Sequence, residues 1–68
     1  MKMTLAEITI RFKLAEHDAE LKRWLKVNGI KRFVSDNINN KDTMDKFMLI
    51  VNNYSEYIDY VEQVMLLV

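Results

Sequence analysis

Five consecutive apolar residues, Phe47–Val51, constrain the fold of this chain more than any other feature. Side chains in a β-strand point alternately to its two faces, so an apolar run of this length needs cover on both. The chain has 68 residues, which is little material for covering both faces of a sheet. The run therefore predicts that a second copy or another protein completes the fold.

Three segments have the hydrophobic patterns of β-strands. Residues 5–14 alternate between apolar and polar side chains, which predicts a strand with one buried and one exposed face. Its buried face would contain Ala6, Ile8, Ile10, Phe12 and Leu14. Residues 30–35 and 44–51 follow as a second and a third strand, and the turn formers in residues 36–42 predict an antiparallel connection between them.

Residues 16–28 have the spacing of a helix. Leu21 and Leu25 lie four residues apart on one side, and Asp18 is the expected N-cap. Gly29, the only glycine, is expected in the left-handed conformation that commonly ends a helix.

A second helix is expected from Tyr54 to Met65, with Asn53 as its cap and Glu56 completing a capping box. One side of this helix is apolar and contains Tyr54, Tyr57, Ile58, Val61, Val64 and Met65. Residues 65–68 either finish this helix or form a short fourth strand, and the absence of a turn former favours the helix.

Together these elements predict an α+β fold of order βαββα, in which a three-stranded mixed sheet has two helices packed on one face. Residues 1–68 are expected to form a single domain, as is usual for this length. A right-handed crossover would make the first two strands parallel and would place the all-apolar third strand between them.

The composition favours a small cytoplasmic protein. The chain has no cysteine, which suits a reducing compartment and excludes disulfides and thiolate metal sites. Glu7, Arg11 and Lys13 interrupt any signal-peptide core, and no apolar stretch approaches the roughly 18 residues of a membrane span. The net charge is zero, but residues 1–34 carry an excess of Lys and Arg and residues 35–68 an equal excess of Asp and Glu. A composition rich in Asn, Lys and Ile suits a low-GC genome such as that of a phage.

No motif for catalysis, metal binding or a cofactor is present in the sequence. His17 is the only histidine, and it is expected on the surface because no nucleophile motif or carboxylate cluster accompanies it. Asp36, Asp42 and Asp45 lack the glycine and the closing glutamate of a calcium loop. We therefore expect no enzymatic activity, no cofactor and no metal.

A non-enzymatic chain of this size is expected to bind another protein, as a small regulator or inhibitor. The expected partner-binding residues are Arg11 and Lys13 on the open face of the sheet, and Tyr60 beside the apolar side of the second helix. The doubly apolar third strand also predicts a homo-oligomer, such as a homodimer. Trp24 is expected in the core.

Two alternatives remain open. The first is a nucleic-acid-binding module, whose basic patch on the sheet and first helix would comprise Lys22, Lys26, Lys31 and Arg32. The neutral net charge and the lack of an RNA-binding aromatic pattern disfavour it. The second alternative is a minor subunit of a larger assembly.

Overall fold

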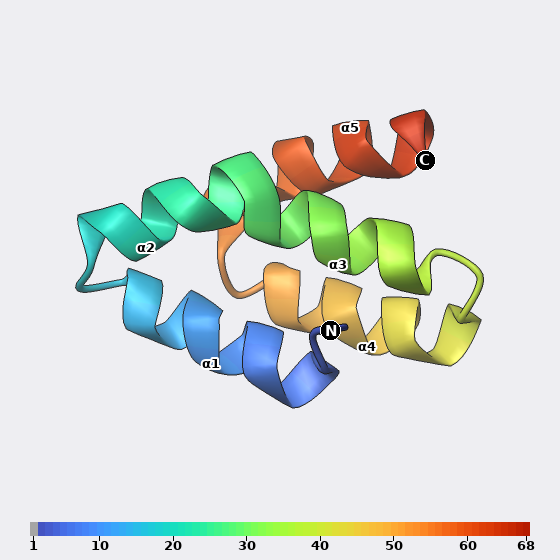
Figure 1. The fold of residues 1–68 in the computed structure, drawn as a ribbon, viewed down its shortest axis with the longest axis horizontal. Helices are drawn as coiled ribbons and strands as arrows, with labels where there is room; N and C mark the ends of the chain where they lie inside the picture. Colours follow the sequence, from blue (N-terminus) through green and yellow to red (C-terminus); the bar gives the residue numbers. More distant parts are fainter. Residues whose placement is uncertain (1) are drawn as a thin grey trace.

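The computed structural model describes residues 2–68, and every regular element in that range is helical (Figure 1). The predicted α+β fold is therefore wrong, because the three segments expected as strands are helices and residues 2–68 contain no sheet. The elements in chain order are α1 (Leu5–Ala15), α2 (Ala19–Trp24), the π-helical turn η1 (Leu25–Gly29), α3 (Ile30–Asn37), α4 (Lys41–Val51), the 3-10 turn η2 (Ser55–Tyr57) and α5 (Ile58–Leu67).

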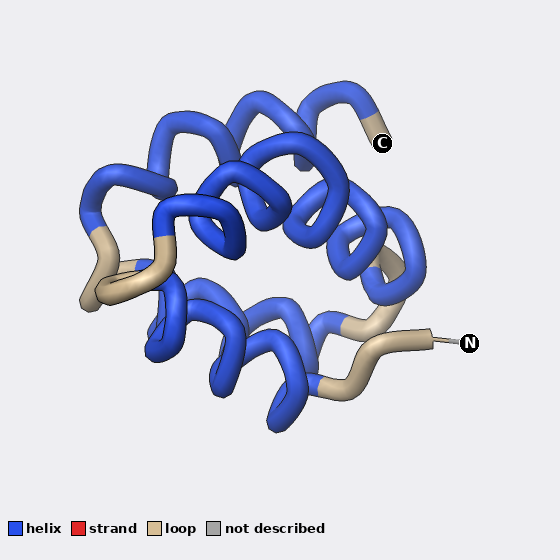
Figure 2. Tube along the Cα trace, turned by 60° about the vertical axis from the view of Figure 1, so that its left-hand side comes forward, coloured by secondary structure: helices blue, strands red, loops and turns tan. Residues whose placement is uncertain are grey.

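The helices form two layers (Figures 1 and 2). α1 and α4 pack against each other in one layer, and the continuous helix α2–η1–α3 packs against α5 in the other. The molecule measures 31 × 22 × 21 Å along its principal axes. Its largest fully buried side chains come from both layers and are Tyr57, Phe12, Phe33, Phe47, Ile8, Leu25, Ile30, Val34, Val51 and Val61.

α1 is a helix because its apolar residues satisfy helical spacing as well as alternation. The buried residues lie four and three positions apart, as one side of a helix requires, and are Ile8, Phe12 and Ala15. Thr4 caps the helix, since its Oγ1 accepts a hydrogen bond from the backbone N–H of Glu7 at 3.1 Å. Ile10, which was predicted on the buried face of a strand, is instead 57% exposed.

The apolar run at residues 47–51 belongs to α4, where only part of it is buried. Asn40 caps this helix by accepting the backbone N–H of Thr43 at 3.2 Å. Both ends of the run lie in the core, whereas Leu49 is 67% exposed. A helix distributes five consecutive residues around its circumference. Residues 47–51 therefore have no two apolar strand faces, and the reason for expecting a partner to cover them no longer applies.

α2, η1 and α3 form one continuous helix over residues 19–37. Asp18 caps its start as predicted, accepting the backbone N–H groups of Glu20 and Leu21 at 3.0 and 3.1 Å. The predicted end at Gly29 is wrong, because this glycine has right-handed helical angles, φ −63° and ψ −53°. The helix therefore continues through the glycine into the segment that was expected as the second strand.

The π-helical turn η1 sets the register of α3. The backbone N–H of Ile30 bonds to the carbonyl of Leu25, five residues earlier, so the turn holds one residue more than an α-helical turn. An α-helix rotates by roughly 100° per residue, so the extra residue turns all of α3 by about that angle. The apolar side chains that reach the core as a result are Ile30, Phe33 and Val34. The same rotation leaves Lys31 and Arg32 exposed.

The last helix largely matches its prediction. Its apolar side is confirmed, with Tyr57, Val61 and Val64 buried and Ile58 and Met65 half-buried. The predicted Asn53 cap is wrong, because the helix enters through η2 with Tyr54 at the N-cap position and no side-chain cap. The C-terminal tail is helical to Leu67, as favoured. None of the helices in residues 2–68 has the length and apolar content that crossing a membrane requires.

Candidate functional site

One side of the continuous helix α2–η1–α3 carries an open surface hollow. The hollow encloses about 500 Å³ and is lined by Trp24, Val27, Asn28, Lys31, Arg32 and Ser35. These residues recur at intervals of three, one, three, one and three, so they form a single stripe along the helix. A second hollow of about 330 Å³ extends the stripe toward the start of α2 through Glu20 and Arg23. We call this stripe, from Glu20 to Ser35, the Trp24 face.

Trp24 is fixed at the centre of the face by two contacts. The guanidinium carbon of Arg11, from α1, lies 4.6 Å from the centroid of the indole ring, which is a cation–π distance. On the helix itself, a Cβ added to Gly29 would lie 2.5 Å from Cζ3 of Trp24, so any larger residue there would displace the ring. The ring is half-buried, and Val27 beside it is 57% exposed.

The Trp24 face is positively charged. Arg23, Lys31 and Arg32 line it and Arg11 borders it, whereas Glu20 is its one acidic lining residue. None of these five forms a salt bridge within residues 2–68, where the ion pairs are Lys22–Glu56, Lys41–Asp45 and Lys46–Asp42. The face thus combines an apolar centre with cations that form no salt bridge in the described part of the chain.

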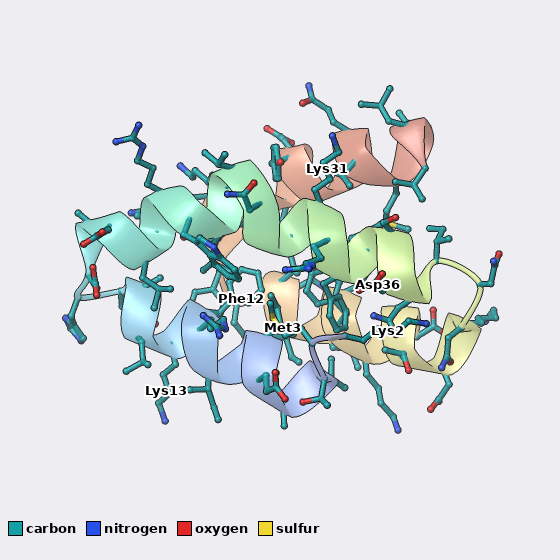
Figure 3. The ribbon with its side chains drawn as sticks, in the orientation of Figure 1. Lys2, Met3, Phe12, Lys13, Lys31 and Asp36 are labelled. Atoms are coloured by element: carbon teal, nitrogen blue, oxygen red, sulfur yellow. The ribbon has the colours of Figure 1, made fainter. Side chains whose placement is uncertain are left out.

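A smaller apolar hollow adjoins the Trp24 face across Lys31. It encloses about 260 Å³ between α3 and α5 and is lined by Lys31, Tyr60, Gln63, Val64, Leu67 and Val68. Because Lys31 lines both hollows, the two lie next to each other. In Figure 3, Lys31 projects from the side of the molecule formed by the α2–α3 and α5 layer.

The three residues predicted to bind a partner do not share one surface. Arg11 does not project from an open sheet, because it lies over the Trp24 ring and is half-buried. Tyr60 lines the hollow beside Lys31. Lys13 projects from the opposite side of the molecule, away from Lys31 (Figure 3). Two of the three therefore border the candidate surface, and Lys13 does not.

The four residues of the predicted basic patch also separate into two pairs. Lys31 and Arg32 line the Trp24 face. Lys22 instead pairs with Glu56 at 2.9 Å, and the Lys26 ammonium lies 5.6 Å from the centroid of the Tyr57 ring.

Trp24 and Val27 were not predicted as surface residues. The residue types at 24, 27, 28, 31, 32 and 35 do follow helical spacing, but a helix that ends at Gly29 cannot place all six on one side. Their grouping depends on a helix that continues through η1, and no residue type in that turn predicts a π-helical geometry.

The core contains one polar group without a partner. The hydroxyl of Tyr57 is buried and has no hydrogen-bond partner among residues 2–68. Burial raises the pKa of Tyr57, and the nearby Glu56 carboxylate raises it further. A phenol held neutral in this way is a poor general base near neutral pH.

Within residues 2–68, no three His, Asp or Glu side chains are arranged to hold a metal ion. His17 lies exposed in the connection between α1 and α2.

No protein-family model, curated protein sequence or solved structure matches this chain. The geometry of the Trp24 face is therefore the basis for a functional proposal.

Proposed function

We propose that this protein is a binding module that holds an acidic, amphipathic segment of another protein on its Trp24 face. The observation that carries the proposal is the combination of a half-buried Trp24 and an exposed Val27 with Arg23, Lys31 and Arg32 around them. Tryptophan and arginine are the residue types that most often dominate protein interfaces. Such a module would act by occupying its partner's surface, as a regulator or inhibitor or as a minor subunit of an assembly.

The charge pattern favours an acidic partner. Cations at the rim of an apolar contact steer a partner of opposite charge and disfavour a basic one. The matching segment is a short helix with aliphatic residues on one side and Glu or Asp beside them, because this would fill the stripe and neutralise its borders.

A nucleic acid fits the same face less well. Single strands are commonly held by bases that stack on exposed aromatic rings. The Trp24 ring is already covered by Arg11 and packed against Gly29, and Lys22 and Lys26 are directed toward other contacts. The cations that remain could contact phosphates, so nucleic acid is treated as the competing outcome in the test.

Fluorescence of Trp24, the only tryptophan, allows a direct measurement. Two Trp-free helical peptides with the same leucine face are titrated into the protein, one with glutamates and the other with lysines on its polar face. We expect the acidic peptide alone to shift the Trp24 emission and to bind more weakly as salt increases. Arg32→Glu should weaken this binding about tenfold, the effect of losing roughly 1.4 kcal/mol at a charged contact.

The controls separate the alternatives. Lys41→Glu changes the charge by the same amount on α4, which does not contribute to the face, and it should leave binding unchanged. Equal loss in both variants would show a non-specific charge effect and contradict the proposal. Tighter binding of a single- or double-stranded oligonucleotide than of the acidic peptide would favour the nucleic-acid alternative. Affinity purification from the native cell, with nuclease-treated and untreated lysates compared, checks the same distinction for the natural partner.

A further inference from the structure

A ridge of apolar side chains runs along the outer side of α1. Ala6, Ile10 and Leu14 follow each other at intervals of four residues, and all three are exposed. Ile10 and Leu14 are each 57% exposed, on the side of the helix opposite the buried Ile8 and Phe12. The residues of the ridge are not part of the buried core, and they do not line the Trp24 face.

The neighbouring helix extends this apolar surface. α1 and α4 form one layer, so their sides away from the core belong to the same outer face of the molecule (Figures 1 and 2). On α4, Leu49 is 67% exposed and follows two ion pairs along the helix, Lys41–Asp45 and Lys46–Asp42. The outer face of the α1–α4 layer therefore presents exposed aliphatic residues from both helices.

The charges beside the ridge suit a second copy of this chain. Glu7 and Lys13 are exposed and flank Ile10 at equal distances along the sequence, so the ridge has one anion and one cation at its borders. Neither residue forms a salt bridge within residues 2–68. Two copies of a neutral ridge do not repel each other, and the cation of one copy can approach the anion of the other. Two copies of the positively charged Trp24 face would repel.

Helix geometry and size support the same occupant. Residues at intervals of four form the ridges that interdigitate in the most common class of helix–helix packing. A standard interface takes roughly 800 Å² from each partner. With extents of 31 × 22 × 21 Å, one whole face along the long axis of this molecule is of comparable size. An interface centred on Ile10 would therefore extend over α4 and include Leu49.

We infer that two copies of this protein form a symmetric dimer through the outer face of the α1–α4 layer, with Ala6, Ile10 and Leu14 of α1 at its centre. The dimer leaves the Trp24 face free, because Lys13 and Lys31 project from opposite sides of the molecule (Figure 3). A small interface with few aliphatic anchors is expected to have micromolar affinity.

Sedimentation equilibrium over tens to hundreds of micromolar tests the inference with the full chain. The wild-type mass should rise with concentration from 8.1 kDa toward twice that value. Ile10→Asp and Leu14→Asp should each weaken the dimer at least tenfold, and circular dichroism should show that both variants remain folded. Leu66→Asp is the matched control, because Leu66 is 87% exposed on α5, and it should dimerise like the wild type. A wild-type protein that stays at monomer mass overturns the inference, as does a dimer that Ile10→Asp leaves intact or that Leu66→Asp abolishes.

A charge exchange tests the symmetry directly. Glu7→Lys gives a ridge bordered by two cations, and Lys13→Glu gives one bordered by two anions. Each variant alone should remain monomeric, whereas an equimolar mixture should form a heterodimer at least as readily as the wild type forms its homodimer. A mixture that stays monomeric while the wild type dimerises would place the interface elsewhere. Neither experiment uses a residue of the Trp24 face, so the dimer and the proposed partner binding can fail independently.

Discussion

Replacing Gly29 with alanine tests the central contact of the Trp24 face. Gly→Ala in the middle of a helix usually stabilises by about 1 kcal/mol, because alanine has the higher helix propensity. Here the new Cβ would lie 2.5 Å from Cζ3 of Trp24, so the ring has to move. Overpacking of this kind costs about 1–3 kcal/mol. The clash should outweigh the propensity, and we expect Gly29→Ala to lower the free energy of unfolding by about 1 kcal/mol.

The effect of Gly29→Ala on the free energy of unfolding should change from destabilising to stabilising when the Trp24 ring is absent. In a Trp24→Leu background the shorter side chain leaves the space free, so Gly29→Ala should stabilise by about 1 kcal/mol. The two measurements differ by about 2 kcal/mol, within the range found for residues in contact. Thermal melts followed by circular dichroism resolve the changes, since 1 kcal/mol shifts the melting temperature of so small a domain by roughly 4–8 °C. If Gly29→Ala stabilises both backgrounds equally, Trp24 does not pack on Gly29 and the reasoning fails.

Three further predictions concern the core, a helix cap and the pH dependence. Phe12→Ala should cost about 3–5 kcal/mol and largely unfold the chain, because its ring contacts three other aromatic rings at centroid distances of 5.0–6.0 Å; Ile10→Ala, at an exposed position, should shift the melting temperature little. Asn40→Ala should lower the unfolding free energy by about 1 kcal/mol through the lost cap, while the adjacent Asn39→Ala is the neutral control in the same urea titration. The folded-state pKa of Tyr57 lies above the ordinary value of 10.0, so its contribution to stability is complete below pH 10.0 and is lost as the pH rises through the folded-state pKa. Alkaline unfolding should therefore be less steep in Tyr57→Phe than in the wild type, and identical pH profiles would contradict the burial of this phenol.

The two helices predicted from the sequence differ physically from the segments that were misassigned. The start of α2 was recognised from its cap, Asp18, whereas the apolar side of α5 was recognised from its periodicity alone, since the cap predicted for it was wrong. Residues 5–14 satisfy alternation and helical spacing together, since Ile8 and Phe12 belong to both patterns. The deciding signals were the caps, with Thr4 three residues before Glu7 and Asn40 three residues before Thr43. Both cap residues are visible in the sequence, but Thr4 was not considered as a cap and Asn40 was assigned to a turn.

The candidate site was harder to predict from the sequence than the helices were. Arg11 and Tyr60 were selected for other reasons and border the surface, whereas Trp24 was assigned to the core, against which it packs with its ring half-buried. Whether a tryptophan lies inside a protein or at its edge depends on which helices surround it. That information is tertiary, because the positions of Arg11 and Gly29 around the ring follow from the packing of α1 against the continuous helix.

The extra residue in η1 also bears on how this chain could vary among its descendants. Inserting a residue into an α-helix normally rotates every following side chain out of place, yet here a single turn absorbs the insertion. A relative that lost one residue between positions 25 and 29 would have an unbroken α-helix, and its following side chains would keep the directions that they have here. The counterparts of Ile30, Phe33 and Val34 would still reach the core without any change in the hydrophobic pattern of α3. A gap of one residue at this turn, with the apolar residues of α3 preserved, would therefore be compatible with the same fold.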